Sequence, residues 1–213
     1  MSPRPYRLGQ RAPSVIQTRT RILAATRELL TSDGVGGVVM DEVAQRADVA
    51  RATVYYQFGS KRGLLEAIVA DVQRRAGQQQ IGRAVELADP LQALRRSFVL
   101  GCRFWASEQL IVRRLSGLAA VDPEIRDVLT SADQQRLVLV TRLVDRLADA
   151  GQLVAGCSCD RAIDVLWLLS SFEAFDQLFT GRRLPPQEVA TVLLDLARCV
   201  LAPPGPDRPG DAS

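Results

Sequence analysis

The residues best suited to chemistry stand close together between positions 46 and 61. Arg51 and Thr53 fall at the start of a short helix expected over about 51–57. An arginine can bind guanine O6 and N7 with two hydrogen bonds, and the methyl group of a threonine can contact thymine. A helix that presents its first residues to the major groove brings such side chains to the base edges. Arg51 and Thr53 are therefore candidates for reading a DNA sequence.

Two short helices and a tight turn must position these side chains. The first helix is expected over about 40–47, and the second over about 51–57. Asp48 suits a left-handed turn position, because Asp tolerates that conformation better than most residues. Val49 can fill the angle between the two helices. This pattern predicts a helix-turn-helix.

The rest of the sequence also has the periodicity of helices, and no strand pattern stands out. A helix capped by Ser14 is expected to end near Asp33, with Gly34 in the left-handed position after it. Ser60 can cap a further helix that runs to about Leu87. Later helices are expected over 91–106, 108–120, 123–150, 160–179 and 185–201. The predicted fold class is all-α.

Charge and composition suggest two domains. Residues 1–62 contain 10 Arg and Lys against 5 Asp and Glu, whereas the remainder has 17 against 19. A basic N-terminal module indicates a polyanionic partner. The expected organisation is a flexible basic arm (1–13), a three-helix helix-turn-helix domain (14–66), a larger helical ligand-binding and dimerisation domain (67–202) and a disordered tail (203–213).

The segment from Arg21 to Ile68 resembles the DNA-binding domain of the TetR family of repressors. The matching residues are Arg21-Ile22-Leu23-Ala24-Ala25, Gly34, Glu42-Val43-Ala44, Ala47-Asp48-Val49, Ala52-Thr53-Val54-Tyr55-Tyr56-Gln57-Phe58 and Ser60-Lys61-Arg62-Gly63-Leu64-Leu65. The sequence departs from the family pattern at Val38-Val39, Asp48, Ala50 and Gln57. The resemblance implies a transcriptional regulator that binds operator DNA as a homodimer and is switched by a small molecule, most simply a repressor that its ligand releases.

The resemblance also implies roles for single residues. Tyr56 and Lys61 are expected to bind phosphate, and Lys61 stands in the first turn of a helix whose free N–H groups can also take a phosphate oxygen. Tyr55 could contact either bases or phosphate. Arg21 and Arg46 are equally well explained as phosphate contacts or as ordinary surface residues. The candidate DNA contacts are Arg21, Arg46, Arg51, Ala52, Thr53, Tyr55, Tyr56, Gln57 and Lys61.

A ligand pocket and a dimer interface are expected in the C-terminal domain. The candidate pocket residues are Phe98, Phe104, Trp105, Trp167 and Phe172, which could equally be packed core. The candidate interface residues are Ile163, Phe175, Val189, Val192, Leu193, Leu196 and Val200. They lie on two apolar helices that suggest a four-helix contact between two subunits. The alternative is that both helices only fill the core of one subunit.

Other classes of function find little support. The chain has no histidine, which removes the common general base, and its carboxylates are scattered, so no catalytic set is expected. Cys157 and Cys159 are too few thiolates for a metal site, and no metal or cofactor is predicted. No apolar stretch is long enough to cross a membrane and no secretory signal is recognised, so the protein is expected in the cytoplasm. A helical adaptor that keeps the fold without specific DNA binding remains the alternative.

Overall fold

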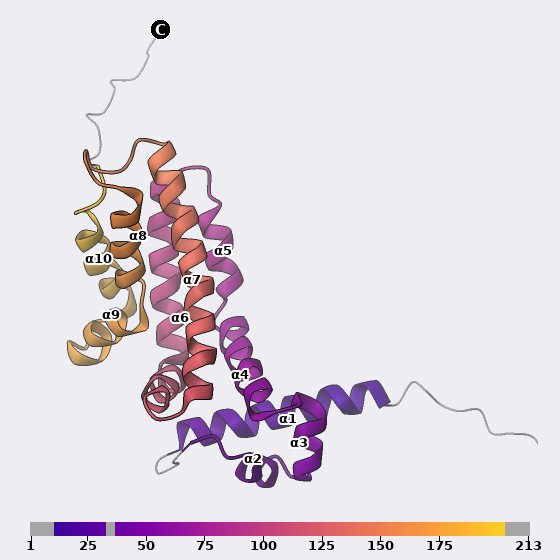
Figure 1. The fold of residues 1–213 in the computed structure, drawn as a ribbon. Helices are drawn as coiled ribbons and strands as arrows, with labels where there is room; N and C mark the ends of the chain where they lie inside the picture. Colours follow the sequence, from indigo (N-terminus) through magenta and orange to yellow (C-terminus); the bar gives the residue numbers. More distant parts are fainter. Residues whose placement is uncertain (1–10, 33–36, 203–213) are drawn as a thin grey trace, which may run out of the picture. The chain divides into compact units, whose positions relative to one another are not determined.

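The computed structural model of this chain describes residues 11–32 and 37–202, and every regular element within these ranges is a helix (Figure 1). The N-terminal helices are α1 (Arg11–Thr31), α2 (Met40–Arg46), α3 (Arg51–Phe58), α4 (Lys61–Arg75) and α5 (Gln78–Val85). The later helices are α6 (Pro90–Ala119), α7 (Pro123–Asp149), α8 (Cys159–Leu169), α9 (Phe172–Asp176), a π-helical turn (Gln177–Gly181) and α10 (Pro186–Ala197). The expected all-α fold is confirmed.

The chain forms two compact units. Unit 1 takes in the chain up to Val72 together with the segment Arg113–Leu129, and unit 2 takes in Gln73–Val112 and the residues from Thr130 onward. Helices α4, α6 and α7 therefore each contribute residues to both units. This division differs from the domain boundary expected after residue 66, because the turn between α6 and α7 packs with the N-terminal helices.

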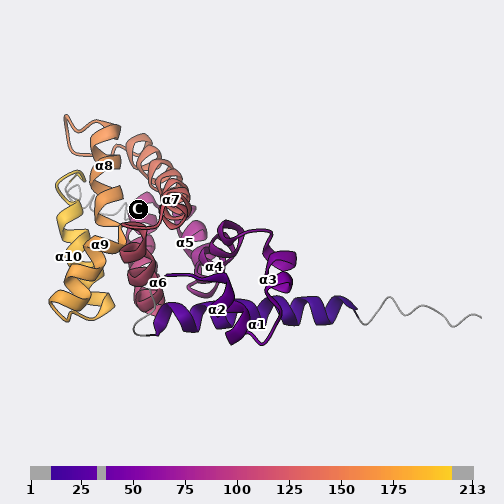
Figure 2. The same cartoon turned by 60° about the horizontal axis from the view of Figure 1, so that its bottom comes forward.

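The core of unit 1 is built from apolar residues at helical spacing. Ile22 on α1, Val43 on α2, Val54 on α3 and both Leu64 and Ile68 on α4 are completely buried. Full burial of an aliphatic side chain of this size stabilises a fold by about 1.5–3 kcal/mol. Because four helices share this core, α3 is held on one side by α1, α2 and α4 (Figure 2).

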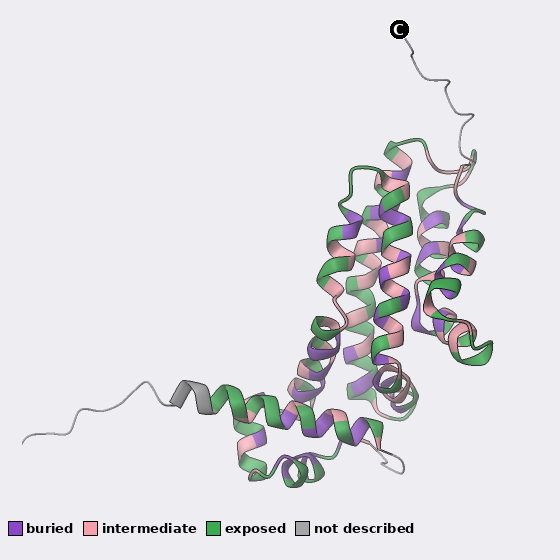
Figure 3. Cartoon of the chain, turned by 180° about the vertical axis from the view of Figure 1, so that it is seen from behind, coloured by how far each residue is buried: buried purple, intermediate pink, exposed green. Residues whose placement is uncertain are grey.

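The core of unit 2 lies among α6, α7, α8 and α10. Leu94, Leu147, Leu166 and Val189 are at most 1% exposed and belong to one apolar cluster. Buried and exposed residues alternate along these helices, as amphipathic helices require (Figure 3). Helices α8 and α10 lie side by side in Figures 1 and 2.

Several helix boundaries differ from those expected. The helix expected over 61–87 is divided at Gly77, whose φ of +79° is left-handed, and gives α4 and α5. The segment 91–120, expected as two helices, is the single helix α6. The segment 160–179, expected as one helix, breaks before Ser171, which caps α9 with its side chain. A cap satisfies the free N–H groups of a new helix, so the break costs little.

The N-terminal helix also begins earlier than expected. Helix α1 begins at Arg11, ahead of the cap predicted at Ser14, so the expected arm is shorter. The remaining arm residues, Gly34 and the tail from 203 to 213 lie outside the described residues. Within the described part of the chain, none of the helices combines the length and apolar character needed to cross a membrane.

Candidate nucleic-acid interface

The turn between α2 and α3 has the geometry of a helix-turn-helix. Asp48 has a φ of +50°, the left-handed conformation that the sequence predicted. The Val49 N–H donates to the carbonyl of Ala44 at 3.0 Å and closes the turn. Helix α3 then begins at Arg51, and Ala50 at its N-cap offers no side-chain hydrogen bond. The first N–H groups of α3 are therefore left without a side-chain cap.

Helix α3 has one buried and one exposed face. Val54 and Phe58 are buried in the core of unit 1. The exposed residues are Arg51, Ala52, Tyr55 and Tyr56. Tyr56 is 82% exposed, and a ring of this size in water gains little from the fold of its own chain. The exposed face of α3 is therefore the part of unit 1 best placed to meet a partner.

Arg51 is held by two neighbours. Its Nη1 donates to Asp41 Oδ2 at 3.1 Å, and its Nη2 donates to the Tyr55 hydroxyl at 3.4 Å. The guanidinium also lies 5.5 Å from the centroid of the Tyr55 ring. The hydrogen bond with Tyr55 and then the charge of Asp41 raise the pKa of Arg51 above its usual value. Because a guanidinium has five N–H donors, these two bonds leave donors for a base edge.

Two other predicted residues of α3 are less accessible. Thr53 is half-buried, and its backbone N–H donates to the Ala50 carbonyl at 2.8 Å. Gln57 is half-buried as well, and its backbone carbonyl accepts a hydrogen bond from Arg19 Nη1 at 2.7 Å. The Arg19 guanidinium lies 4.3 Å from the centroid of the Phe58 ring. Arg19 on α1 thus provides a donor for the Gln57 carbonyl near the end of α3 and links the two helices.

Arg46 and Arg21 are exposed on α2 and α1. Arg46 Nη1 donates to Ser32 Oγ at 3.3 Å and lies 4.0 Å from Glu28 Oε2. Exposed pairs of this kind contribute little, so a phosphate could replace them at small cost. A phosphate contact by either arginine stays a prediction.

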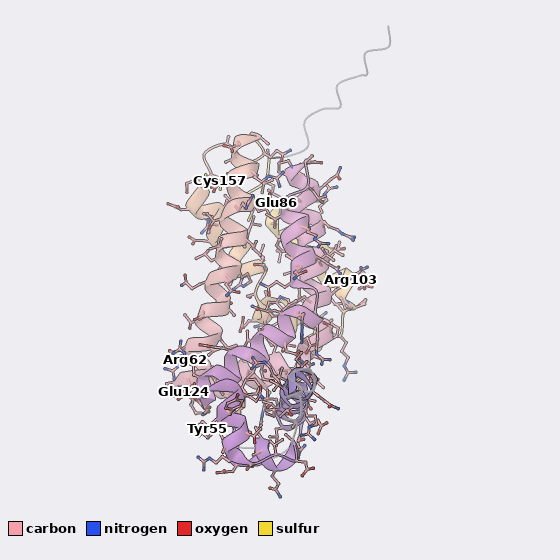
Figure 4. The ribbon with its side chains drawn as sticks, turned by 90° about the vertical axis from the view of Figure 1, so that its right-hand side faces the viewer. Tyr55, Arg62, Glu86, Arg103, Glu124 and Cys157 are labelled. Carbon is pink, nitrogen blue, oxygen red and sulfur yellow. The ribbon has the colours of Figure 1, made fainter. Side chains whose placement is uncertain are left out.

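Lys61 makes an ion pair that the sequence did not predict. Its Nζ donates to Asp122 Oδ2 at 2.5 Å, and the two side chains are 31% and 19% exposed. Lys61 begins α4, which Ser60 caps by accepting the Gly63 N–H at 3.0 Å, as expected. Figure 4 labels Arg62 and Glu124, which mark the adjacent starts of α4 and α7 within unit 1.

Sequence reasoning missed Asp41 and Asp122 as partners of the candidate DNA-binding residues. An Asp followed by Pro123 is a recognisable start of a helix, so the capping role of Asp122 could have been found. Its pairing with Lys61 could not, because the two residues are 61 positions apart and only the packing of unit 1 brings them together.

Most of the five predicted pocket residues lie in the core of unit 2. Phe104, Trp105 and Phe172 form a run of edge-to-face rings, with centroid distances of 4.7 Å and 5.6 Å. Phe98 is buried in the same core, whereas Trp167 is 37% exposed on α8. A shallow depression lies elsewhere on unit 2, lined by Leu87, Gln92, Arg95, Arg96 and Val99. Trp167 is thus the most exposed of the five residues, and a ligand pocket at these residues stays a prediction.

The predicted dimer-interface residues divide into buried and exposed side chains, and the interface itself stays a prediction. Phe175, Val189, Leu193 and Val200 are at most 3% exposed, and their side chains belong to the core of unit 2. They are covered by the helices of their own chain and offer no surface to a second subunit. Leu196 is 54% exposed, and Ile163 and Val192 are half-buried. The periodicity of α8 and α10 predicted an apolar stripe. It could not distinguish a stripe buried within one subunit from a stripe buried against a second subunit.

Cys157 and Cys159 flank the cap of α8. Ser158 Oγ accepts the Arg161 N–H at 3.2 Å, which explains the small residues of this turn. No group of three or more His, Cys, Asp and Glu side chains that could hold a metal ion is found among the described residues.

Comparison with known proteins gives matches over both units. Residues 22–68 match the family model of the bacterial regulatory proteins, tetR family. The HTH-type transcriptional repressor NicS of Pseudomonas putida is 31% identical over 87 residues, which are 41% of this chain and 41% of NicS. The chain thus matches less than half the length of that relative. The HTH-type transcriptional regulator AlkX of Mycobacterium tuberculosis is 26% identical over 189 residues, which are 85% of this chain and 82% of AlkX.

A solved structure agrees with these sequence matches. NalD, the secondary repressor of the MexAB-OprM multidrug efflux pump in Pseudomonas aeruginosa, has a TM-score of 0.72 and 25% identity, covering 90% of this chain and 100% of NalD. The fold and the geometry of α2 and α3 define a helix-turn-helix protein with a second helical unit. Within that class, residues 22–68 match the tetR family of bacterial regulatory proteins, and the chain is similar to AlkX and NalD over most of its length.

Proposed function

We propose that this protein is a sequence-specific DNA-binding repressor that a small molecule releases from its operator. The observation that carries the proposal is the arrangement of α3, where Arg51 and Tyr56 are exposed while Val54 and Phe58 anchor the opposite face in the core. A helix anchored in this way can enter a major groove without losing its own packing. The match of residues 22–68 to the tetR family model supports the same function.

We assign two roles to the candidate DNA contacts. Arg51 and Thr53 stand at the start of α3, and we assign both to contacts with base edges. The methyl group of Thr53 would contact a thymine. We assign Tyr56 and Lys61 to phosphates, which fix the protein on the duplex but carry no sequence information. Tyr55 holds Arg51 in place and contributes to base reading indirectly.

A selection from a randomised duplex pool, followed by affinity measurements over a salt series, tests this function. Arg51→Ala should reduce discrimination among sequences by about ten- to hundredfold at one base pair. Arg198→Ala is the matched control, because Arg198 is 79% exposed in unit 2 and its loss removes the same charge. If the wild-type protein selects no sequence and its binding does not depend on salt, the proposal is wrong and a helical adaptor is the better interpretation.

We propose that two copies associate through α8 and α10. Trp167, Leu168 and Leu196 are exposed apolar side chains on these helices, with exposed fractions of 37%, 62% and 54%. A self-complementary apolar patch of this kind suits a twofold dimer. A dimer is also what a pair of operator half-sites needs, because each half-site takes one recognition helix.

We propose that the effector binds beside the aromatic run of Phe104, Trp105 and Phe172. A ligand shifts an equilibrium only by its difference in affinity for the two conformations, so it must bind the DNA-free form more tightly. A panel of apolar small molecules can be screened for release of the selected duplex. Trp105→Leu should abolish the response and leave DNA affinity intact. An unchanged response in Trp105→Leu would place the effector elsewhere.

A further inference from the structure

The two oxygen atoms of Asp122 have separate partners. Oδ1 accepts the Glu124 N–H at 3.0 Å and the Ile125 N–H at 3.4 Å, so it caps α7. Oδ2 accepts from Lys61 Nζ at 2.5 Å. The cap fixes the orientation of the carboxylate, and the second oxygen is thereby presented to Lys61 without further ordering.

Lys61 is the only lysine of the chain and follows closely on α3. A lysine ammonium is a compact charge, and its attraction for a phosphate falls when a carboxylate already neutralises it. The Lys61 side chain is still 31% exposed, so it can leave Asp122 for a nearby anion.

We propose that the Asp122 carboxylate competes with an operator phosphate for the Lys61 ammonium, and that this competition lowers the affinity of the protein for DNA. The inference rests on the proposed DNA-binding function. It adds that Asp122, which lies on the turn between α6 and α7, sets how much of the Lys61 charge is available to DNA. Asp122 is thus a positioning residue that acts through Lys61.

A neighbouring pair provides a matched control. Arg62 Nη1 lies 3.6 Å from Asp127 Oδ2, and both side chains are at least half exposed. Asp127 belongs to the same segment of unit 1 as Asp122, so its neutralisation changes the net charge equally and nearby. Its ion pair is with Arg62.

Asp122→Asn is the decisive variant, because Asn is as good an N-cap as Asp and keeps α7 capped. We expect Asp122→Asn to bind the selected duplex about two- to fivefold more tightly than Asp127→Asn, on the scale of a partly exposed ion pair. The slope of log affinity against log salt should steepen by about 0.9 for each additional phosphate that is neutralised. In a Lys61→Ala background, Asp122→Asn should have no effect beyond that of Asp127→Asn.

Each result decides the matter. Tighter binding and a steeper salt slope that both require Lys61 support the competition. If the wild-type protein binds its duplex but Asp122→Asn binds it no more tightly than Asp127→Asn does, this inference is wrong while the proposed function stands. A wild-type protein without any preferred duplex overturns the proposed function as well.

The single lysine also allows the pair to be observed directly in the free protein. With ¹³C-labelled lysine, one set of side-chain signals is expected, and its Cε resonance should move in Asp122→Asn but not in Asp127→Asn. Addition of the duplex should move the wild-type resonance. An unchanged Cε resonance in Asp122→Asn would contradict the ion pair itself, independently of any DNA measurement.

Discussion

Arg136 on α7 closes the end of α8 by contacting Trp167 in two ways. Its Nη1 donates to the Trp167 carbonyl at 2.5 Å, and its guanidinium lies 4.9 Å from the centroid of the Trp167 ring. The same nitrogen donates to Ser170 Oγ at 2.9 Å. The last carbonyl groups of a helix lack partners within the helix, so a guanidinium that reaches them from a neighbouring helix satisfies them. Arg136 therefore ties α7 to α8 and orients the exposed tryptophan.

Replacing Arg136 by Ala should lower the free energy of unfolding by about 1–2 kcal/mol, because the Trp167 carbonyl and the Ser170 hydroxyl lose a charged donor. Urea unfolding followed by tryptophan fluorescence measures this change. The control is Arg198→Ala, whose side chain is 79% exposed and should change stability by less than about 0.5 kcal/mol. Equal effects of the two variants would show that the contact to Trp167 contributes nothing.

Leu193→Glu and Leu196→Glu should behave differently although both add a charge to α10. Leu193 is 3% exposed, so a carboxylate there should destabilise unit 2 by about 3 kcal/mol or more. Leu196 is 54% exposed, so its variant should keep its thermal transition but give monomers in sedimentation. A dimer that survives Leu196→Glu would place the interface away from this helix.

The stability that Asp122 contributes should depend on pH. Burial acts to raise the pKa of Asp122, but the hydrogen bonds from Lys61, Ile125 and Glu124 outweigh it and hold the pKa below 3.8. The ionised carboxylate therefore stabilises the fold above pH 3.8, and this contribution is lost as the pH falls through the lowered folded-state pKa.

Lys61→Met should consequently be less stable than wild type at neutral pH, and the difference should shrink as the solution becomes strongly acidic. Urea titrations between neutral and acidic pH measure it. Arg62→Met is the control. Because Arg62 pairs with exposed carboxylates, its replacement should lower the free energy of unfolding by less. A Lys61→Met deficit that stays constant down to the most acidic solution would exclude the ion pair as its cause.

The cysteines should differ in reactivity. Burial raises the pKa of Cys102 to about 12, so its thiolate is scarce at pH values where exposed thiols react. Cys159 and Cys199 are exposed. Alkylation of the native protein, followed by peptide mass spectrometry, should label these two and spare Cys102 until denaturant is added. Labelling of Cys102 at the rate of Cys159 would indicate that unit 2 opens readily.

Local patterns in the sequence were enough for the helix-turn-helix. Asp48 adopts the left-handed conformation expected from its residue type, and Ser60 caps α4 as predicted. These features depend on residues close together in the chain, so residue type and spacing suffice to predict them. The division at Gly77 was missed because a glycine within an apolar periodicity can either continue a helix or end it.

The sequence by itself determined that the chain is helical and where the second helix of its helix-turn-helix begins, because helical periodicity and caps are local properties. Only the tertiary structure decided that Leu193 is core while Leu196 is surface, and that Lys61 meets Asp122. Both are consequences of packing between residues distant in the chain. An apolar stripe predicts burial and a charge predicts an ion pair, but only the packing of the fold determines which residue provides the contact.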